Sequence, residues 1–179
     1  MVTHADLTTW AGPDRVHRAA RRTVAAWDIP PEAKRLLTEV GIPITEQIVT
    51  HVRYQGGPSP ELLASGGRQF YKLAIIRSEP NPDFWQAFGI QPITGEVHHI
   101  LWTGEARFTN SSVELWLRSL HHVGHHLSRS RVLDDPFEDE DAAVNELQAL
   151  ADDLKEIDPS AFEGYEAFTW PAFLDRWLW

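Results

Sequence analysis

The chain has 179 residues and a mass of 20.4 kDa, with 42% hydrophobic and 23% charged residues. This length and composition fit one globular domain with an ordinary core, and they fit neither a wholly disordered chain nor a membrane protein. The formal net charge of −10 disfavours direct binding to nucleic-acid phosphates or anionic lipid, because both attract clustered lysine and arginine. A basic surface is the expected electrostatic partner.

The negative charge is concentrated at one end of the sequence. Residues 1–37 carry 6 basic and 4 acidic side chains, residues 38–132 carry 8 of each, and residues 133–179 carry 2 and 14. The densest run holds six carboxylates: Asp134, Asp135, Glu138, Asp139, Glu140 and Asp141. The sequence therefore predicts a nearly neutral body with a strongly acidic end.

The chain has no cysteine, which excludes disulfides, thiolate metal sites and thiol nucleophiles. Residues 1–10 lack the apolar core of a secretory signal, and no apolar run approaches the roughly 18 residues of a membrane span. We therefore expect a cytoplasmic protein.

Helices are predicted in the first third of the chain. Asp6 can cap a short helix that runs through Trp10, and a basic helix is expected over residues 15–27 after the Gly12-Pro13 break. A further helix should begin at Pro31 and end near Gly41, because its apolar residues recur at helical spacing.

From residue 48 to residue 108 the apolar period changes toward two. Short strands are predicted over residues 48–54, 70–76, 85–90, 97–102 and 106–108. Thr94-Gly95 and Thr103-Gly104 are turn signals that would join the last three strands antiparallel. The glycine- and proline-rich segments 56–60 and 65–67 predict a long, loose first connection.

Helices follow the strands. Ser111 and Glu114 have capping-box spacing, and an apolar stripe continues from Val113 to Leu127. A helix over about 141–156 should bury Val144, Leu147, Leu150 and Leu154, and a last short helix from Trp170 should carry Phe173, Leu174, Trp177 and Leu178. Strands gathered between helices predict an α+β fold: one domain over residues 1–179, with a central antiparallel sheet of about five to six strands and helices packed around it.

Four histidines on the predicted helix, His121, His122, His125 and His126, include two i,i+4 pairs, a spacing that can hold a transition metal. The two pairs should project from different sides of the helix, and the HExxH pattern is absent. A metal-dependent enzyme using His121 and His125 is therefore a minor hypothesis, and a solvated helix face is the favoured interpretation. His98 and His99 should point to opposite faces of a strand.

The acidic run allows three interpretations. It lacks the alternating ligands and central glycine of an EF-hand, which disfavours calcium. Carboxylates at a helix N-terminus complement the helix dipole, and a concentrated charge can also bind a basic protein partner. These last two interpretations remain open.

Catalytic motifs are missing from the sequence. The double-glycine loops lack a Lys-Ser/Thr ending, and no GxSxG elbow is present. We expect no catalytic residues, no metal and no cofactor. Of the eight tryptophans, most should be core, Trp116 among them, and an exposed one would mark a binding surface.

Several segments, in this order, resemble one known family. These are residues 31–43, 94–97, 107–116, 157–159 and 170–171, and the stretch Phe108-Thr109-Asn110-Ser111-Ser112-Val113-Glu114 is the most specific. Together they are similar to the fourth subgroup of the SUKH superfamily of bacterial immunity proteins. The resemblance implies one α+β domain with a central antiparallel sheet and no catalytic residues to carry over.

The resemblance also implies a function. The protein would bind and neutralise a toxin encoded nearby, with nuclease and nucleic-acid deaminase toxins as common partners of the superfamily. The six carboxylates of the acidic run are our candidate toxin-binding residues. A regulatory or scaffold module of the same fold, with an endogenous partner, is the alternative.

Overall fold

The computed structural model describes residues 1–46, 48–49, 51–52, 62–77, 85–164 and 168–176. The helices in these ranges are α1 (His4–Ala11), α2 (Arg21–Ala25), α3 (Pro31–Glu39), α4 (Val113–Leu127), α5 (Glu140–Ile157) and α6 (Thr169–Asp175), with short 3-10 turns η1 (Pro13–Arg15) and η2 (Pro159–Phe162). The strands are β1 (Val16–His17), β2 (Ile42–Pro43), β3 (His51–Val52), β4 (Leu62–Ser65), β5 (Arg68–Arg77), β6 (Trp85–Ile90), β7 (Val97–Leu101) and β8 (Ala106–Asn110). The α+β class is confirmed.

In the described ranges the main sheet has six strands, all antiparallel to their neighbours. Its order is β3-β5-β6-β7-β8, and β4 pairs with β5 beyond the end of β3. The predicted antiparallel joining of β6, β7 and β8 is confirmed. The register of β8 on β7 shifts at Thr109, which lies between the partners of Val97 and His98.

The connection at residues 65–67 is a tight hairpin and not the loose loop expected from the sequence. Ser65 pairs with Arg68 across the Gly66-Gly67 turn. Both glycines have positive φ, 55° and 76°, as a two-residue type I′ turn requires. Two glycines in succession therefore indicate a strand reversal at this point. Segment 56–60 lies outside the described residues.

The basic helix expected over residues 15–27 is also wrong. Residues 13–15 form η1, β1 then pairs with β2 in a separate two-stranded sheet, and only residues 21–25 are α-helical. Residues 16 and 17 form a strand instead of a helix because their backbone pairs with Pro43 and Ile42, which lie 27 and 25 residues further along the chain. Near the N-terminus, Thr3 is the cap of α1, and Asp6 completes the capping box as the third helical residue.

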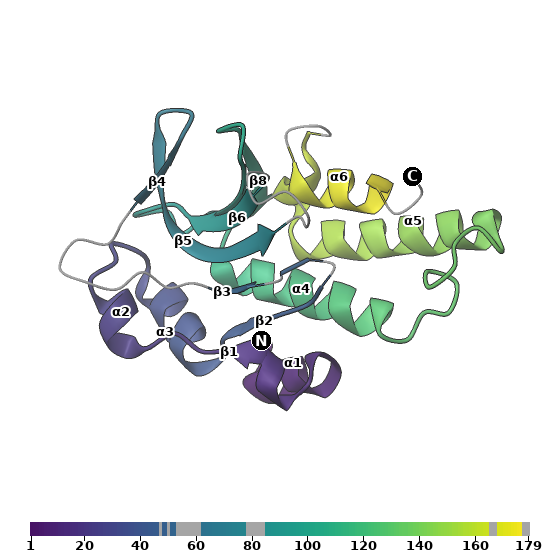
Figure 1. Ribbon diagram of the computed structural model, residues 1–179, viewed down its shortest axis with the longest axis horizontal. Coiled ribbons are helices and arrows are strands. Elements are labelled where there is room, and N and C mark those ends of the chain that lie inside the picture. Colours follow the sequence, from purple (N-terminus) through teal and green to yellow (C-terminus); the bar gives the residue numbers. More distant parts are fainter. Residues whose placement is uncertain (47, 50, 53–61, 78–84, 165–167, 177–179) are drawn as a thin grey trace.

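Helices α4, α5 and α6 form a layer beside the sheet. Figure 1 shows α4 and α5 side by side and antiparallel, with their connection at the end of the molecule away from the sheet. Helices α1 and α3 pack on α4. The apolar stripe of α4 is buried as predicted, with Leu127 half-buried at its end. On α5, Val144 is 47% exposed instead of buried, and Ala143 occupies the core position.

The start of α4 differs from the expected capping box. Ser112 is the N-cap and accepts a hydrogen bond from the Leu115 N–H, at 3.2 Å. Ser111 instead donates its hydroxyl to Asp158, at 2.9 Å. Trp27, Trp116 and Trp170 are fully buried, while Trp102 is half exposed. Trp177, Leu178 and Trp179 lie outside the described residues.

None of the helices in the described ranges has the length and apolar character needed to cross a bilayer.

Candidate functional site

The six predicted acidic residues lie together on the connection between α4 and α5 and on the first turn of α5. All six are exposed: Asp134, Asp135, Glu138, Asp139, Glu140 and Asp141. Within the described residues, no salt bridge joins any of them to a basic side chain. Their charges therefore face solvent at the end of the molecule that lies farthest from the sheet (Figure 1).

The acidic residues divide into a helix start and a loop. Asp139 is the N-cap of α5, because its carboxylate accepts the Ala142 N–H at 3.0 Å. Glu140 and Asp141 occupy the first turn, where carboxylates complement the helix dipole. The loop is anchored by Leu133, which is 4% exposed, while Phe137 is 71% exposed. The helix-start interpretation is thus confirmed for half of the run, and the loop presents an aromatic ring among carboxylates.

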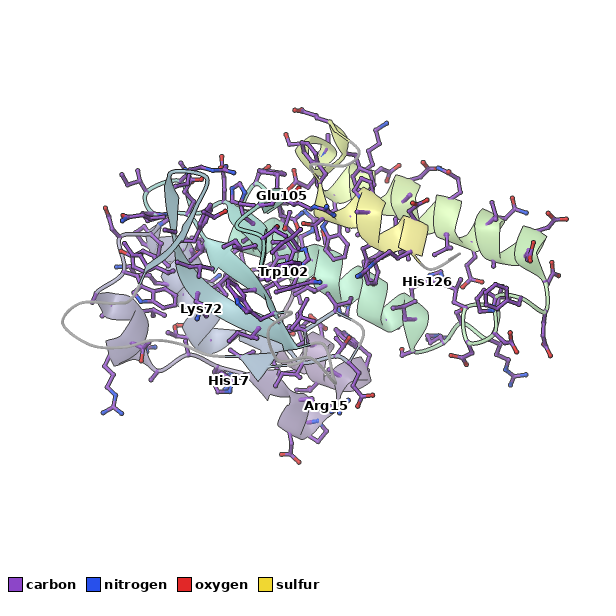
Figure 2. The ribbon with its side chains drawn as sticks, turned by 45° about the horizontal axis from the view of Figure 1, so that its top comes forward. Arg15, His17, Lys72, Trp102, Glu105 and His126 are labelled. Atoms are coloured by element: carbon purple, nitrogen blue, oxygen red, sulfur yellow. The ribbon has the colours of Figure 1, made fainter. Side chains whose placement is uncertain are left out.

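The four histidines of α4 face two different neighbours, as their spacing predicts. On one side, the Trp10 indole N–H donates to Nδ1 of His121 at 3.0 Å. On the other side, both contacts are to α5. Nε2 of His122 lies 2.9 Å from Oδ2 of Asp153, and Nε2 of His126 lies 2.7 Å from Oε1 of Glu146. Figure 2 shows His126 between α4 and α5.

The prediction that the four histidines form a solvated helix face is therefore wrong. Three of the four side chains link α4 to α1 or α5, and only His125 is exposed. In the part of the chain that is described, no three His, Asp or Glu side chains are grouped so that they could hold a metal ion. The role of the histidines in this structure is helix packing.

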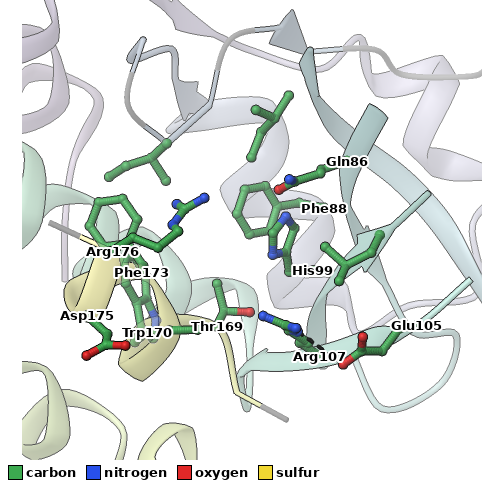
Figure 3. Close-up of a pocket in the computed structure, with 14 residues that line it drawn as sticks. Gln86, Phe88, His99, Glu105, Arg107, Thr169, Trp170, Phe173, Asp175 and Arg176 are labelled. Atoms are coloured by element: carbon green, nitrogen blue, oxygen red, sulfur yellow. Dashed lines mark hydrogen bonds and ion pairs between the residues drawn. The ribbon is translucent and has the colours of Figure 1, made fainter. Parts of the chain in front are cut away.

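A cavity of about 730 Å³ lies between one face of the sheet and α6. The strand register determines which side chains line the cavity on the sheet side. Phe88 pairs with His99 on β7, and His99 pairs with Arg107 on β8, so the three side chains share one face of the sheet. The Phe88 and His99 rings are stacked with centroids 5.1 Å apart. Figure 3 shows this row facing Thr169, Phe173 and Arg176 of the α6 segment.

The α6 wall of the cavity is fixed by hydrogen bonds to the end of β8. Thr169 and Thr109 share a hydrogen bond of 2.8 Å between their hydroxyls. The Trp170 indole N–H donates to Oδ1 of Asn110 at 3.0 Å. Because both contacts are buried, the α6 wall is held rigidly against the sheet.

His99 is the buried polar group of the cavity. Burial lowers the pKa of His99 to about 3, and the positive charges of Arg176 and Arg107 act in the same direction. The imidazole is therefore neutral at physiological pH, and its Nε2 has no hydrogen-bond partner among the residues that the structure describes. His98 points to the other face, where its ring contacts Phe70 and Phe108, so the predicted separation of the two histidines is confirmed.

No pattern in the sequence indicates this cavity. Its polar residues come from three strands, the turn before β8 and the α6 segment, and their meeting depends on the strand register and on the docking of α6. Alternation places His99 on one face of β7 but does not show which residue of β8 lies opposite. Exposed Trp102, the marker anticipated from the tryptophan count, lies in the turn after β7 and not among the lining residues.

The comparisons with known proteins agree with the motif order. Residues 2–176 match the family model described as SUKH-4 immunity protein. No curated protein and no solved structure matches the chain. The matched range includes both the acidic run and every residue that lines the cavity.

Proposed function

Because the chain belongs to the SUKH-4 immunity protein family, we propose that it binds a cognate toxin encoded nearby and neutralises it in the cytoplasm of the producing cell. The observation that carries this proposal is the family match over residues 2–176. The protein acts as a stoichiometric inhibitor and not as an enzyme.

The acidic run supplies the proposed toxin-binding surface. Its carboxylates are exposed at one end of the molecule, and the exposed ring of Phe137 lies among them. An aromatic side chain surrounded by charge is a common arrangement in protein interfaces, where the ring provides most of the affinity and the charges steer association.

The charge also indicates the kind of toxin. Nucleases and nucleic-acid deaminases hold the phosphate backbone with lysine and arginine. A run of six carboxylates presents a competing set of anions to such a basic surface. We therefore propose a basic nuclease or deaminase domain as the partner, bound by the protein without any direct contact between this chain and nucleic acid.

The test uses the toxin domain encoded by the neighbouring gene. Co-expression of the full chain should restore growth to cells that produce the toxin domain, and the two purified proteins should form a stoichiometric complex. A variant of the toxin lacking its catalytic residue should still form the complex, because binding does not require the toxin's activity. No complex and no protection, with a toxin domain that is active on its own, would contradict the proposal.

A further inference from the structure

The cavity between the sheet and α6 holds more hydrogen-bond donors than the protein uses. Arg107 donates through Nε to Glu105 at 3.1 Å, which leaves the two terminal amino groups of its guanidinium. The Arg176 guanidinium lies over the Phe173 ring, 5.8 Å from its centroid, and makes no side-chain hydrogen bond or ion pair with any described residue. The side-chain amide of Gln86, which also lines the cavity, likewise has no hydrogen bond to a described residue. Among the described residues, the terminal amino groups of Arg107, the guanidinium of Arg176 and the Gln86 amide are therefore left to bind a ligand.

Positive charge exceeds negative charge inside the cavity. Arg107 and Arg176 are the charged groups that act on the buried His99 ring, and both are positive. Of the two carboxylates in the lining, Glu105 pairs with Arg107 from the turn after β7. Figure 3 shows the Asp175 carboxylate turned away from the cavity, while the Arg176 guanidinium is turned into it. The interior therefore favours an anion.

The remaining walls are apolar and aromatic. Phe88 and His99 are stacked on the sheet side, and Phe173 with Trp170 lies on the α6 side. A volume of about 730 Å³ is within the range of pockets that bury small organic molecules. An inorganic anion alone would leave most of these walls without contact.

We propose that this cavity binds an organic carboxylate carried on an apolar or aromatic stem. The guanidinium groups of Arg107 and Arg176 bind the carboxylate, since their planar fork matches its two oxygens. The stem lies between the sheet-side and α6-side aromatic rings. A singly charged group is favoured over a phosphate monoester because Glu105 already offsets the charge of Arg107, which leaves one uncompensated positive charge in the cavity.

The carboxylate can come from two sources: a small free acid, or an Asp or Glu side chain on the surface of a bound toxin. The second source rests on the proposed function, and the first does not. Both require the same two arginines, so a free acid tests the chemistry without any toxin.

The experiment follows the side-chain resonances of His99 and Gln86 in the full chain by NMR during titration with 3-phenylpropionate. Saturable shifts are expected in the wild type. Arg107→Gln and Arg176→Gln should each weaken binding about tenfold, because a hydrogen bond to a charged group is lost. Arg118→Gln, at an exposed position on α4, removes the same charge far from the cavity and should leave the affinity unchanged.

Two matched ligands determine what is recognised. The neutral 3-phenylpropionamide should bind at least tenfold more weakly than the acid, and phenyl phosphate should not bind more tightly than the acid. Equal binding of the amide, tighter binding of phenyl phosphate, or no saturable shift with the acid would each overturn the proposal. Backbone spectra that match the wild type show that the variants are folded.

The toxin assay then identifies the source. If Arg107→Gln and Arg176→Gln also weaken a toxin complex that the wild type forms, the carboxylate is presented by the toxin. If both variants bind the toxin as tightly as the wild type does, but bind 3-phenylpropionate more weakly, the ligand is a free acid. A wild-type chain that forms no toxin complex contradicts the proposed function and leaves the titration result standing.

Discussion

Asn110 at the end of β8 donates its side-chain amide to the carboxylate of Asp158 after α5, with 3.0 Å between Nδ2 and Oδ2. Asp158 is 2% exposed and also accepts from the Ser111 N–H at 2.7 Å. The other end of the Asn110 side chain accepts the Trp170 indole N–H. One buried network therefore joins the sheet, α5 and α6 at residues far apart in the sequence.

Replacing Asp158 with alanine should destabilise the protein strongly. The change removes the acceptor of the Ser111 N–H and leaves the buried Asn110 amide with only Ser119 Oγ, at 3.3 Å, and each unsatisfied buried group costs about 1–3 kcal/mol. We expect the free energy of unfolding to fall by about 2–4 kcal/mol in urea denaturation. Asp152→Ala, on the exposed face of α5, is the matched control and should change it by less than about 0.5 kcal/mol. Equal effects of the two changes would show that the network contributes little.

Gly124→Ala should destabilise the chain although alanine is the better helix former. A Cβ at this position of α4 would overlap the indole ring of Trp10. In an open helix the change would add roughly 0.5–1 kcal/mol of stability. Here we expect a loss of about 1–3 kcal/mol, because the ring must move and its hydrogen bond to His121 breaks.

A double-mutant cycle separates these effects. In a Trp10→Ala background the clash is absent, so Gly124→Ala should become neutral or stabilising when unfolding is measured in urea. The same loss in both backgrounds would mean that Trp10 is not the cause.

The pH dependence of stability should reveal the buried neutral His99. The pKa of His99 is about 3 in the folded chain, against an ordinary value of 6.5. Between these values the unfolded chain binds a proton that the folded chain does not, so acid favours unfolding. The contribution of His99 is complete above pH 6.5 and is lost as the pH falls toward 3, with a slope of up to about 1.4 kcal/mol per pH unit.

Urea unfolding at pH 7, 6 and 5 measures this slope. His99→Phe keeps an aromatic ring against Phe88 and removes the titrating group, so its stability should fall less steeply with acid. Burial also lowers the pKa of His98 and of His121, and their contributions remain in the variant. Identical slopes for the two proteins would indicate that folding does not lower the pKa of His99.

Neutralising the loop part of the acidic run should slow association with the toxin. The triple change Asp134→Asn, Asp135→Asn and Glu138→Gln removes three exposed charges and leaves the Asp139 cap intact. We expect the association rate at low salt to fall about three- to tenfold and its dependence on salt to weaken. Stopped-flow mixing across a salt series measures both.

The control removes the same number of charges elsewhere, through neutralisation of the exposed Asp14, Glu156 and Glu163. A local effect lowers the rate only in the loop variant, whereas an effect of net charge lowers it in both. Equal rates for the loop variant and the wild type would remove the acidic run from the interface.

The elements that were predicted correctly are those with local signals. Helix α3 has proline at its first residue, α4 has a long apolar stripe, and the turns at Gly95 and Gly104 mark the ends of their strands. The elements that were missed depend on distant partners. Residues 16–17 form a strand only because residues 42–43 lie beside them, and Ser111 turns to Asp158 instead of capping the next helix.

The candidate sites follow the same division. The acidic run is contiguous, so its exposure at the start of α5 could be predicted from charge alone. The cavity could not be predicted, because Phe88, His99 and Arg107 meet through two strand registers and Arg176 is added by a helix that docks through Asn110 and Thr109.

The connection between α4 and α5 contributes Leu133 to the core, while its acidic residues are all exposed. Changes of sign or shape in this loop therefore leave the Asn110–Asp158 network untouched, since substitutions at separated positions act independently on stability. Within the described residues, the acidic run, which is proposed to bind the partner, shares no hydrogen bond with the Asn110–Asp158 network that stabilises the fold. If this loop binds the toxin as proposed, its substitutions can change the partner that is recognised without lowering the free energy of unfolding.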